Sequence, residues 1–234
     1  HLDVSYQDER GQTVHAAEAS GSWSGEAYQL HFLGDRLRIA SNDYTINPDN
    51  LLSLRKRDNF LLGSLKLTGE KRGEFSLQAT EETPGVQDIL LGIHNLHLED
   101  YRSLGLPDVG GIFFGDVHYQ RKGDLSQQPT ISGDLSISDL RYEDKKLGHF
   151  TSSLFYEPRS GDSHYITGEI GYNGQPAMSI DGIYYPREKV SPLKGTLTLT
   201  SFPLELANPF LAENSTTLAG TANGSIRLSG KLTE

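Results

Sequence analysis

The chain has 234 residues, of which 25 are glycine, and its 21 Lys and Arg against 31 Asp and Glu give a formal net charge of −10. This acidic balance argues against a nucleic-acid binder, which needs a basic face, and against docking on anionic lipid through a polybasic patch. The absence of cysteine excludes disulfides, cysteine-ligated zinc and a thiol nucleophile. The length suffices for one large all-β unit or two small domains.

Short runs of alternating apolar and polar residues dominate the chain and predict half-buried strands. In the run 195–200, Leu197 and Leu199 alternate with three threonines, and in 224–232 Ile226 and Leu228 alternate with polar residues. One apolar and one polar face per strand is typical of antiparallel sheets. In chain order, the other runs cover residues 64–67, 74–79, 116–120, 133–137 and 165–172.

Turn residues separate these runs at short intervals. Asn173-Gly174 lies between the runs 166–172 and 177–184 and predicts a two-residue hairpin. Strands that recur every ~8–12 residues indicate an all-β architecture. Helical spacing is restricted to Leu96–Leu106, which we expect to stop at Gly105-Leu106-Pro107, and to Phe202–Leu211.

Two segments about a hundred residues apart have a similar pattern. Each reads as a strand, a short helix, Gly-x-x-x-Gly and an alternating strand, with the glycine pairs Gly111/Gly115 and Gly220/Gly224. Such a repeat is typical of a modular, elongated structure rather than a closed globule. The chain also opens and stops in mid-pattern, so we expect it to be a piece of a longer protein.

Residue types that could catalyse a reaction or bind a metal form no recognisable constellation. His94 and His97 are three apart, and such residues on a strand face opposite sides, which does not suit a shared metal even with His118 nearby. The adjacent carboxylates Glu81-Glu82 face opposite ways near a turn, unlike a glycosidase pair. Residues 21–25 do not match the nucleophile elbow Gly-x-Ser-x-Gly. We therefore expect no enzymatic activity, no metal site and no cofactor.

The C-terminal part of the chain resembles a known family. Residues 202–211, Phe-Pro-Leu-Glu-Leu-Ala-Asn-Pro-Phe-Leu, and 218–230, Leu-Ala-Gly-Thr-Ala-Asn-Gly-Ser-Ile-Arg-Leu-Ser-Gly, are similar to a repeat junction of the TamB family. Segments 96–119, 131–137 and 147–150 are also similar to repeats of that family. TamB proteins are inner-membrane-anchored subunits of the translocation and assembly module and belong to the AsmA-like, bridge-like lipid transfer proteins.

The resemblance implies an elongated, curved, mainly antiparallel β-sheet that forms an open trough (a β-taco) with one or two short helices. Two trough segments are expected, residues 1–110 and 111–234. The resemblance further implies a location in the periplasm of a Gram-negative bacterium, with an inner-membrane anchor outside this piece. The implied partners are phospholipid acyl chains and a TamA-like outer-membrane barrel.

An apolar trough that spans the periplasm would carry phospholipid between the inner and outer membranes. From the alternation alone, ten residues are expected to line it. Two alternatives stay open: a chaperone-like scaffold that accepts strands of outer-membrane β-barrel proteins, and a carbohydrate-binding β-sandwich. The ten expected lining residues are Leu135, Ile137, Ile166, Ile170, Met178, Ile180, Leu197, Leu199, Ile226 and Leu228.

Overall fold

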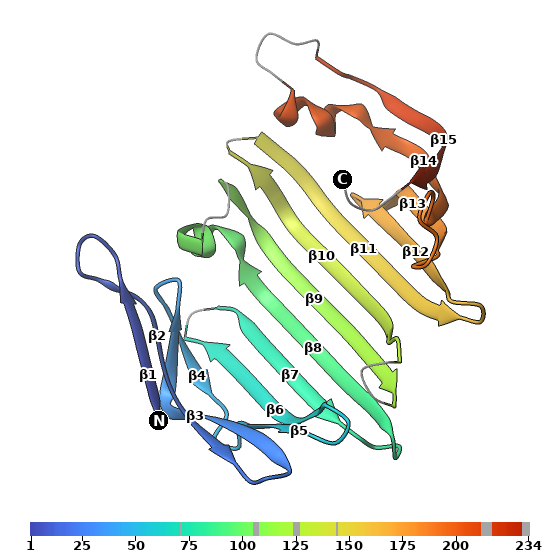
Figure 1. Ribbon diagram of the computed structural model, residues 1–234. Helices are drawn as coiled ribbons and strands as arrows, with labels where there is room; N and C mark the ends of the chain where they lie inside the picture. The colour runs from blue at the N-terminus through green and yellow to red at the C-terminus, as the bar shows by residue number, and fades with distance from the viewer. Residues whose placement is uncertain (71, 105–107, 124–126, 144, 212–216, 231–234) are drawn as a thin grey trace. The chain divides into compact units, whose positions relative to one another are not determined.

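A computed structural model describes residues 1–70, 72–104, 108–123, 127–143, 145–211 and 217–230 (Figure 1). These residues form fifteen strands and two short 3-10 helices, and the strand pairs are antiparallel. The all-β, antiparallel class predicted from the alternation is therefore confirmed. No helix in these ranges is both long enough and apolar enough to cross a membrane. The chain divides into two units, His1–Pro129 (unit 1) and Thr130–Glu234 (unit 2).

Unit 1 is a single sheet with strand order β1-β2-β3-β4-β6-β7-β8-β9, and the short β5 pairs with both β3 and β6. A 3-10 helix, η1, connects β8 to β9. The elements are β1 (Leu2–Gln7), β2 (Thr13–Trp23), β3 (Ala27–Ile39), β4 (Asn42–Ile46), β5 (Leu51–Arg55), β6 (Phe60–Gly69), β7 (Glu74–Thr80), β8 (Val86–His97), η1 (Leu98–Leu104) and β9 (Val109–Lys122).

Unit 2 is a six-stranded meander in which each strand pairs with the next along the chain. A second 3-10 helix, η2, connects the last two strands. The elements are β10 (Thr130–Tyr142), β11 (Lys145–Arg159), β12 (Ser163–Tyr172), β13 (Gln175–Tyr184), β14 (Leu193–Pro203), η2 (Leu204–Phe210) and β15 (Thr221–Gly230).

The division between the units falls later than the expected boundary between residues 110 and 111. The reason is the pairing of β9, which runs along β8 from Lys122 opposite Val86 to Ile112 opposite His97. A strand that shares a ladder with β8 belongs with it, so the Gly111 repeat junction lies inside unit 1. The structure therefore divides the chain between Pro129 and Thr130.

Both expected helices are present as shorter 3-10 helices. Leu96 and His97 stay in β8, because they pair with Phe113 and Ile112, so η1 begins only at Leu98. The expected stop at residues 105–107 lies outside the described residues. The predicted hairpin is confirmed: Tyr172 pairs with Gln175 across a two-residue turn. Both turn residues have positive φ, 49° at Asn173 and 79° at Gly174, as the hairpin turn requires.

The buried core of unit 1 lies where η1 covers one end of its sheet. Tyr101 of η1 is buried, and its ring lies 6.4 Å edge-on from that of Phe75. The Tyr101 hydroxyl is hydrogen-bonded to the hydroxyl of Tyr44, which is fully buried. Burial raises the pKa of Tyr44 to about 12, and the nearby Asp100 carboxylate adds to this rise.

The predicted repeat is visible in the backbone of the two helix-containing connections. The strand before each helix has a bulge with one residue of positive φ, Asn95 (53°) in β8 and Ser201 (48°) in β14. The 3-10 helix follows, and a glycine of positive φ, Gly111 or Gly220, lies where the chain returns to the sheet. The two units thus use the same local device to place a helix at one end of the sheet.

Candidate functional site

The register of unit 2 places all ten expected lining residues on one face of its sheet, here called the apolar face of unit 2. Residues that lie opposite each other in neighbouring strands share a face, and side chains alternate along each strand. The register therefore forms rows that cross the strands. One row joins Leu135, Ser152, Ile170, Met178 and Leu199; the next joins Leu154, Gly168, Ile180, Leu197 and Ile226; a third joins Tyr156, Ile166, Gly182, Gly195 and Leu228, and Ile137 lies opposite Phe150.

The opposite face of unit 2 is composed mainly of hydroxyl and charged side chains. Thr167 of β12 lies opposite Asp181 of β13, which in turn lies opposite Thr196 of β14. Asp181 also accepts a 2.6 Å hydrogen bond from the hydroxyl of Tyr165. The sheet of unit 2 is therefore amphipathic across its whole width: one face is polar and suits contact with water, whereas the other face is apolar. Further members of the polar face are Ser132, Ser136, Thr151, Ser153, Glu169, Ser179, Thr198, Ser225 and Arg227.

The apolar face of unit 2 is open rather than buried. None of the ten residues is buried; Leu135 is 37% exposed, Ile226 is 50% exposed and the other eight are half-buried. In the described part of unit 2, Ala177 and Pro192 are the buried apolar side chains. A single amphipathic layer needs a cover on its apolar side, and extended exposed apolar patches mark ligand, protein or membrane contacts.

Glycines on the apolar face let the sheet curve. Gly182 and Gly195 lie directly opposite each other, and a Cβ at Gly195 would lie 2.8 Å from the Asp181 carbonyl oxygen. A Cβ at Gly168 would lie 3.0 Å from the Ser153 carbonyl oxygen. A side chain at either position would meet the backbone of the neighbouring strand, so these close approaches require glycine. Figure 1 shows the ribbon of unit 2 turning between β11 and β14.

Aromatic side chains flank the aliphatic centre of this face at both ends of the strands. Phe150 and Tyr172 lie with ring centroids 5.2 Å apart near the turn between β12 and β13. At the other end, His164 lies between Tyr156 and Tyr184, and its ring contacts both. The Tyr156 hydroxyl is hydrogen-bonded to Nδ1 of His164, and burial raises the pKa of this tyrosine. The rows between these ends are mainly aliphatic.

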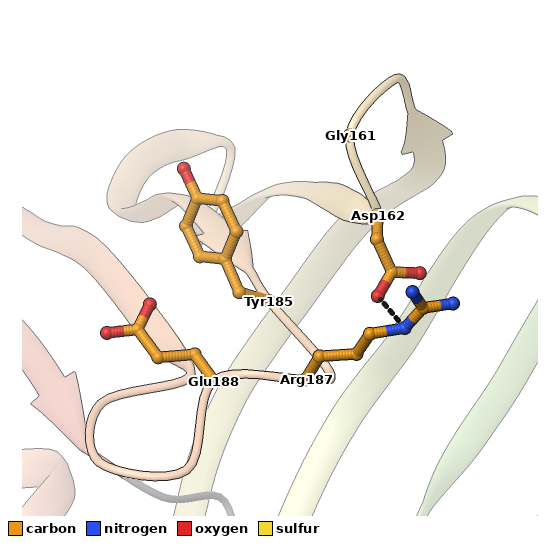
Figure 2. A pocket seen from close by; sticks show the side chains of 5 residues that line it. All are labelled: Gly161, Asp162, Tyr185, Arg187 and Glu188. Atoms are coloured by element: carbon orange, nitrogen blue, oxygen red, sulfur yellow. Dashed lines mark ion pairs between the residues drawn. The ribbon is translucent and has the colours of Figure 1, made fainter.

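A charged hollow lies just beyond the end that carries His164 and Tyr184. Its volume is about 520 Å³, and two connections form it: the loop after β11 and the loop between β13 and β14 (Figure 2). Arg187 Nε lies 2.8 Å from an Asp162 carboxylate oxygen. Glu188 accepts a 3.0 Å hydrogen bond from Lys194 Nζ, which also lies 5.1 Å above the Tyr185 ring. The hollow is thus lined by one cation, two carboxylates and one aromatic ring, and Lys194 adjoins it through its contacts with Glu188 and Tyr185.

Unit 1 also has an apolar face, although none of its residues was among the ten expected from the sequence to line the trough. Leu65, Leu77 and Leu91 lie opposite one another across β6, β7 and β8, and Leu91 is 40% exposed. The sequence feature that indicates this face is the alternation of apolar and polar residues in the runs 64–67 and 74–79. Additional members are Leu30, Leu52, Leu54, Leu61, Ile89, Val117 and Tyr119.

An aromatic and basic corner completes the apolar face of unit 1. Trp23 and Tyr28 lie opposite each other with ring centroids 4.3 Å apart, and Tyr28 is 55% exposed. Lys56 Nζ lies 5.1 Å above the Trp23 ring. A second hollow of about 520 Å³ lies here, lined by Gly25, Glu26, Arg55, Lys56 and Arg57.

The structure keeps the other candidate groups of the sequence apart. His94 lies 2.9 Å from Asp116, whereas His97 Nδ1 lies 2.7 Å from Arg72 Nη1. The expectation that the two histidines face opposite sides is wrong, because the bulge at Asn95 puts Leu96 on the face of Ile93, so that His94 and His97 share the other face. His118 contacts Asp88. In the part of the chain that the structure describes, no group of three or more His, Asp or Glu side chains is arranged to hold a metal ion.

Comparisons of the chain with protein-family models, with curated proteins and with solved structures found no match. The geometry of the two apolar faces therefore carries the functional argument.

Proposed function

We propose that the apolar faces bind the acyl chains of phospholipids. The observation that carries this proposal is the open row structure of unit 2, in which aliphatic side chains from six strands share one face and none of the ten expected residues is buried. Burial of an acyl chain contributes about 0.8 kcal/mol per CH₂ and requires no directional polar partner. Such a surface binds through its area rather than through one residue.

The dimensions of unit 2 suit an acyl chain. Six strands at a spacing of ~4.8 Å make a row of about 24 Å. One leaflet of a bilayer core is ~15 Å thick, half of the ~30 Å of the whole core, which gives the length of one acyl chain along its axis. A row is thus long enough to hold one chain across the strands.

The resemblance to the TamB family extends the proposal to a cellular role. In that role the chain is a segment of a periplasmic conduit that carries phospholipid between the inner and outer membranes, together with an outer-membrane barrel partner. The mainly aliphatic centre of the face favours acyl chains over carbohydrate, for which exposed aromatic platforms would be needed. A strand-accepting scaffold is the competing reading, and the experiment below separates the two.

The test is native mass spectrometry of the chain purified from cells, followed by identification of extracted lipids. The wild-type chain is expected to retain phospholipid. Leu197→Arg places a charge in the middle of a row and is expected to remove the bound lipid, because an unpaired charge is costly on an apolar surface. Thr198→Arg is the matched control, since it puts the same side chain one residue away on the polar face.

Circular dichroism of both variants checks that each keeps its strand content. Lipid retained by Thr198→Arg and lost from Leu197→Arg supports the proposal. A folded wild-type chain that carries no phospholipid and takes none up from vesicles overturns it. Binding of unfolded outer-membrane β-barrel protein in place of lipid would transfer the assignment to the strand-accepting scaffold.

A further inference from the structure

The charged hollow of unit 2 lies at the edge of the apolar face. The outermost row of that face includes His164 and Tyr184, and the hollow begins within two residues of each, at Asp162 and Tyr185. An amphiphile whose chain ends at this outermost row therefore has its polar end within reach of the hollow. The hollow is also at the end of β14 opposite η2, so the helix does not cover it.

The charged side chains at the hollow form two exposed ion pairs, Asp162 with Arg187 and Glu188 with Lys194, so their charges cancel. Figure 2 shows Asp162 and Arg187 directed toward each other, with Tyr185 and Glu188 on the other side of the hollow. The side chain of Arg187 is 88% exposed. Exposed ion pairs contribute little to stability, so these groups can exchange partners with a ligand at small cost.

Unit 1 has a related hollow beside its own apolar face, lined by three cations and one carboxylate. There Lys56 lies over Trp23 as Lys194 lies over Tyr185, both at 5.1 Å, and arginines and a carboxylate line the adjacent hollow. This second occurrence comes from different strands and loops, so it is an independent observation. In both units the hollow lies at the strand ends opposite the 3-10 helix.

We infer that the hollow lined by Asp162, Tyr185, Arg187 and Glu188, with Lys194 beside it, binds the headgroup of a phospholipid that carries both a phosphate and an amine. Arginine and lysine side chains bind phosphate oxygens through charge-assisted hydrogen bonds. Carboxylates and an aromatic ring bind an ammonium group. Arg187 with the adjoining Lys194, and Asp162 with Glu188, thus offer both kinds of charge that a zwitterion needs. This inference rests on the proposed function, because it assigns the polar end of the same ligand.

The test compares three lipids with identical oleoyl chains by their displacement of a fluorescent fatty acid from the 234-residue chain. These are dioleoylphosphatidylethanolamine, dioleoylphosphatidylglycerol, which lacks the amine, and dioleoylglycerol, which lacks the headgroup. Wild-type affinity is expected to fall in that order. Arg187→Glu is expected to weaken the phosphatidylethanolamine complex about tenfold, as the loss of one charge-assisted hydrogen bond does, and to leave dioleoylglycerol within about twofold.

Arg227→Glu is the matched control, because it makes the same charge change on the polar face of β15. If Arg187→Glu and Arg227→Glu change phosphatidylethanolamine binding equally, or if wild type binds the three lipids alike, the headgroup site is wrong while acyl-chain binding stands. If wild type binds neither the fatty-acid probe nor any of the three lipids, acyl-chain binding itself is wrong.

Free phosphoethanolamine distinguishes a headgroup site from a site for soluble phosphate compounds. It is expected to compete only weakly with the lipid, since it lacks the acyl contacts that supply most of the affinity. If free phosphoethanolamine binds as tightly as the lipid, and Leu197→Arg leaves that binding unchanged, the hollow recognises a soluble ligand and the inference is overturned.

Discussion

The backbone N–H of Gly220 donates a 2.8 Å hydrogen bond to Oε1 of Glu205, and this contact ties η2 to the segment that leads into β15. The same contact occurs in unit 1, where Gly111 N–H lies 3.2 Å from Oε2 of Glu99. The second residue of each 3-10 helix thus accepts a hydrogen bond from the glycine at which the chain rejoins the sheet. The repeat is therefore a repeat of hydrogen bonds as well as of sequence.

The first prediction concerns the pH dependence of this contact. The Gly220 hydrogen bond lowers the pKa of Glu205. A lowered pKa in the folded state means that the contact stabilises the junction above the ordinary pKa of glutamate and is lost as pH falls through the lowered value. The amide resonance of Gly220 should therefore titrate at a pH below that of a free glutamate. In Glu205→Gln this titration should disappear; its persistence would assign it to another group.

The second prediction concerns the buried tyrosine pair of unit 1. Because the pKa of Tyr44 is raised to about 12, its neutral form stabilises the fold below the ordinary tyrosine pKa of about 10, and that contribution is lost as pH rises from 10 toward 12. An ultraviolet titration should show a tyrosine step near pH 12 that disappears in Tyr44→Phe. If all eleven tyrosines ionise near pH 10 while the circular dichroism spectrum is unchanged, the burial of Tyr44 is contradicted.

The third prediction concerns the role of η1 as a cover. Tyr101→Ala removes the aromatic ring that packs on Phe75 and Leu96, and should lower the free energy of unfolding of unit 1 by about 3–5 kcal/mol. Tyr101→Phe keeps the ring, loses only the contact with the Tyr44 hydroxyl and should cost about 1–3 kcal/mol. Urea denaturation measures both. Equal losses for the two variants would show that the ring itself contributes little.

The fourth prediction concerns the close approach of β13 and β14. Gly195→Ala places a Cβ 2.8 Å from the Asp181 carbonyl oxygen, so the backbone must shift, at a cost of about 1–3 kcal/mol. Gly21→Ala is the control, because its nearest contact is at 3.9 Å. Thermal unfolding should show a lower Tm for the first variant only. A Gly195→Ala chain as stable as wild type would mean that the curve of unit 2 does not depend on this glycine.

The fifth prediction distinguishes area from specific contacts on the apolar face. Leu135→Ala removes part of one exposed side chain and should weaken acyl-chain binding only about fivefold, since each buried CH₂ contributes ~0.8 kcal/mol. Leu135→Arg should abolish binding. The displacement of a fluorescent fatty acid measures both. A loss of binding in Leu135→Ala comparable to that in Leu135→Arg would point to a single contact site instead of a distributed one.

The alternation of side chains explains why the composition of the apolar face of unit 2 could be derived from the sequence. A period of two assigns each residue to a face before any pairing is known, and antiparallel register then aligns the faces of neighbouring strands. All ten residues fall on one side for this reason. That they contact lipid stays a prediction, because alternation identifies a face and not its ligand.

Other features depend on contacts that no single segment contains. The charged hollow of unit 2 brings Asp162 near Arg187 from two separate connections, so neither run of sequence predicts it. The position of Lys56 over Trp23 likewise depends on the pairing of β5 with β3. The boundary between units likewise depends on β9 pairing with β8, which a turn pattern does not reveal.

The mainly aliphatic rows of unit 2 also have a kinetic consequence. Across β13, β14 and β15, a bound chain that shifts along its row by one strand, ~4.8 Å, meets another aliphatic side chain or a glycine in the central rows, and breaks no hydrogen bond as it moves. Positions along a row are therefore nearly equal in energy, and the barriers between them are low. A surface of this kind holds an amphiphile away from water while leaving it free to diffuse in one dimension.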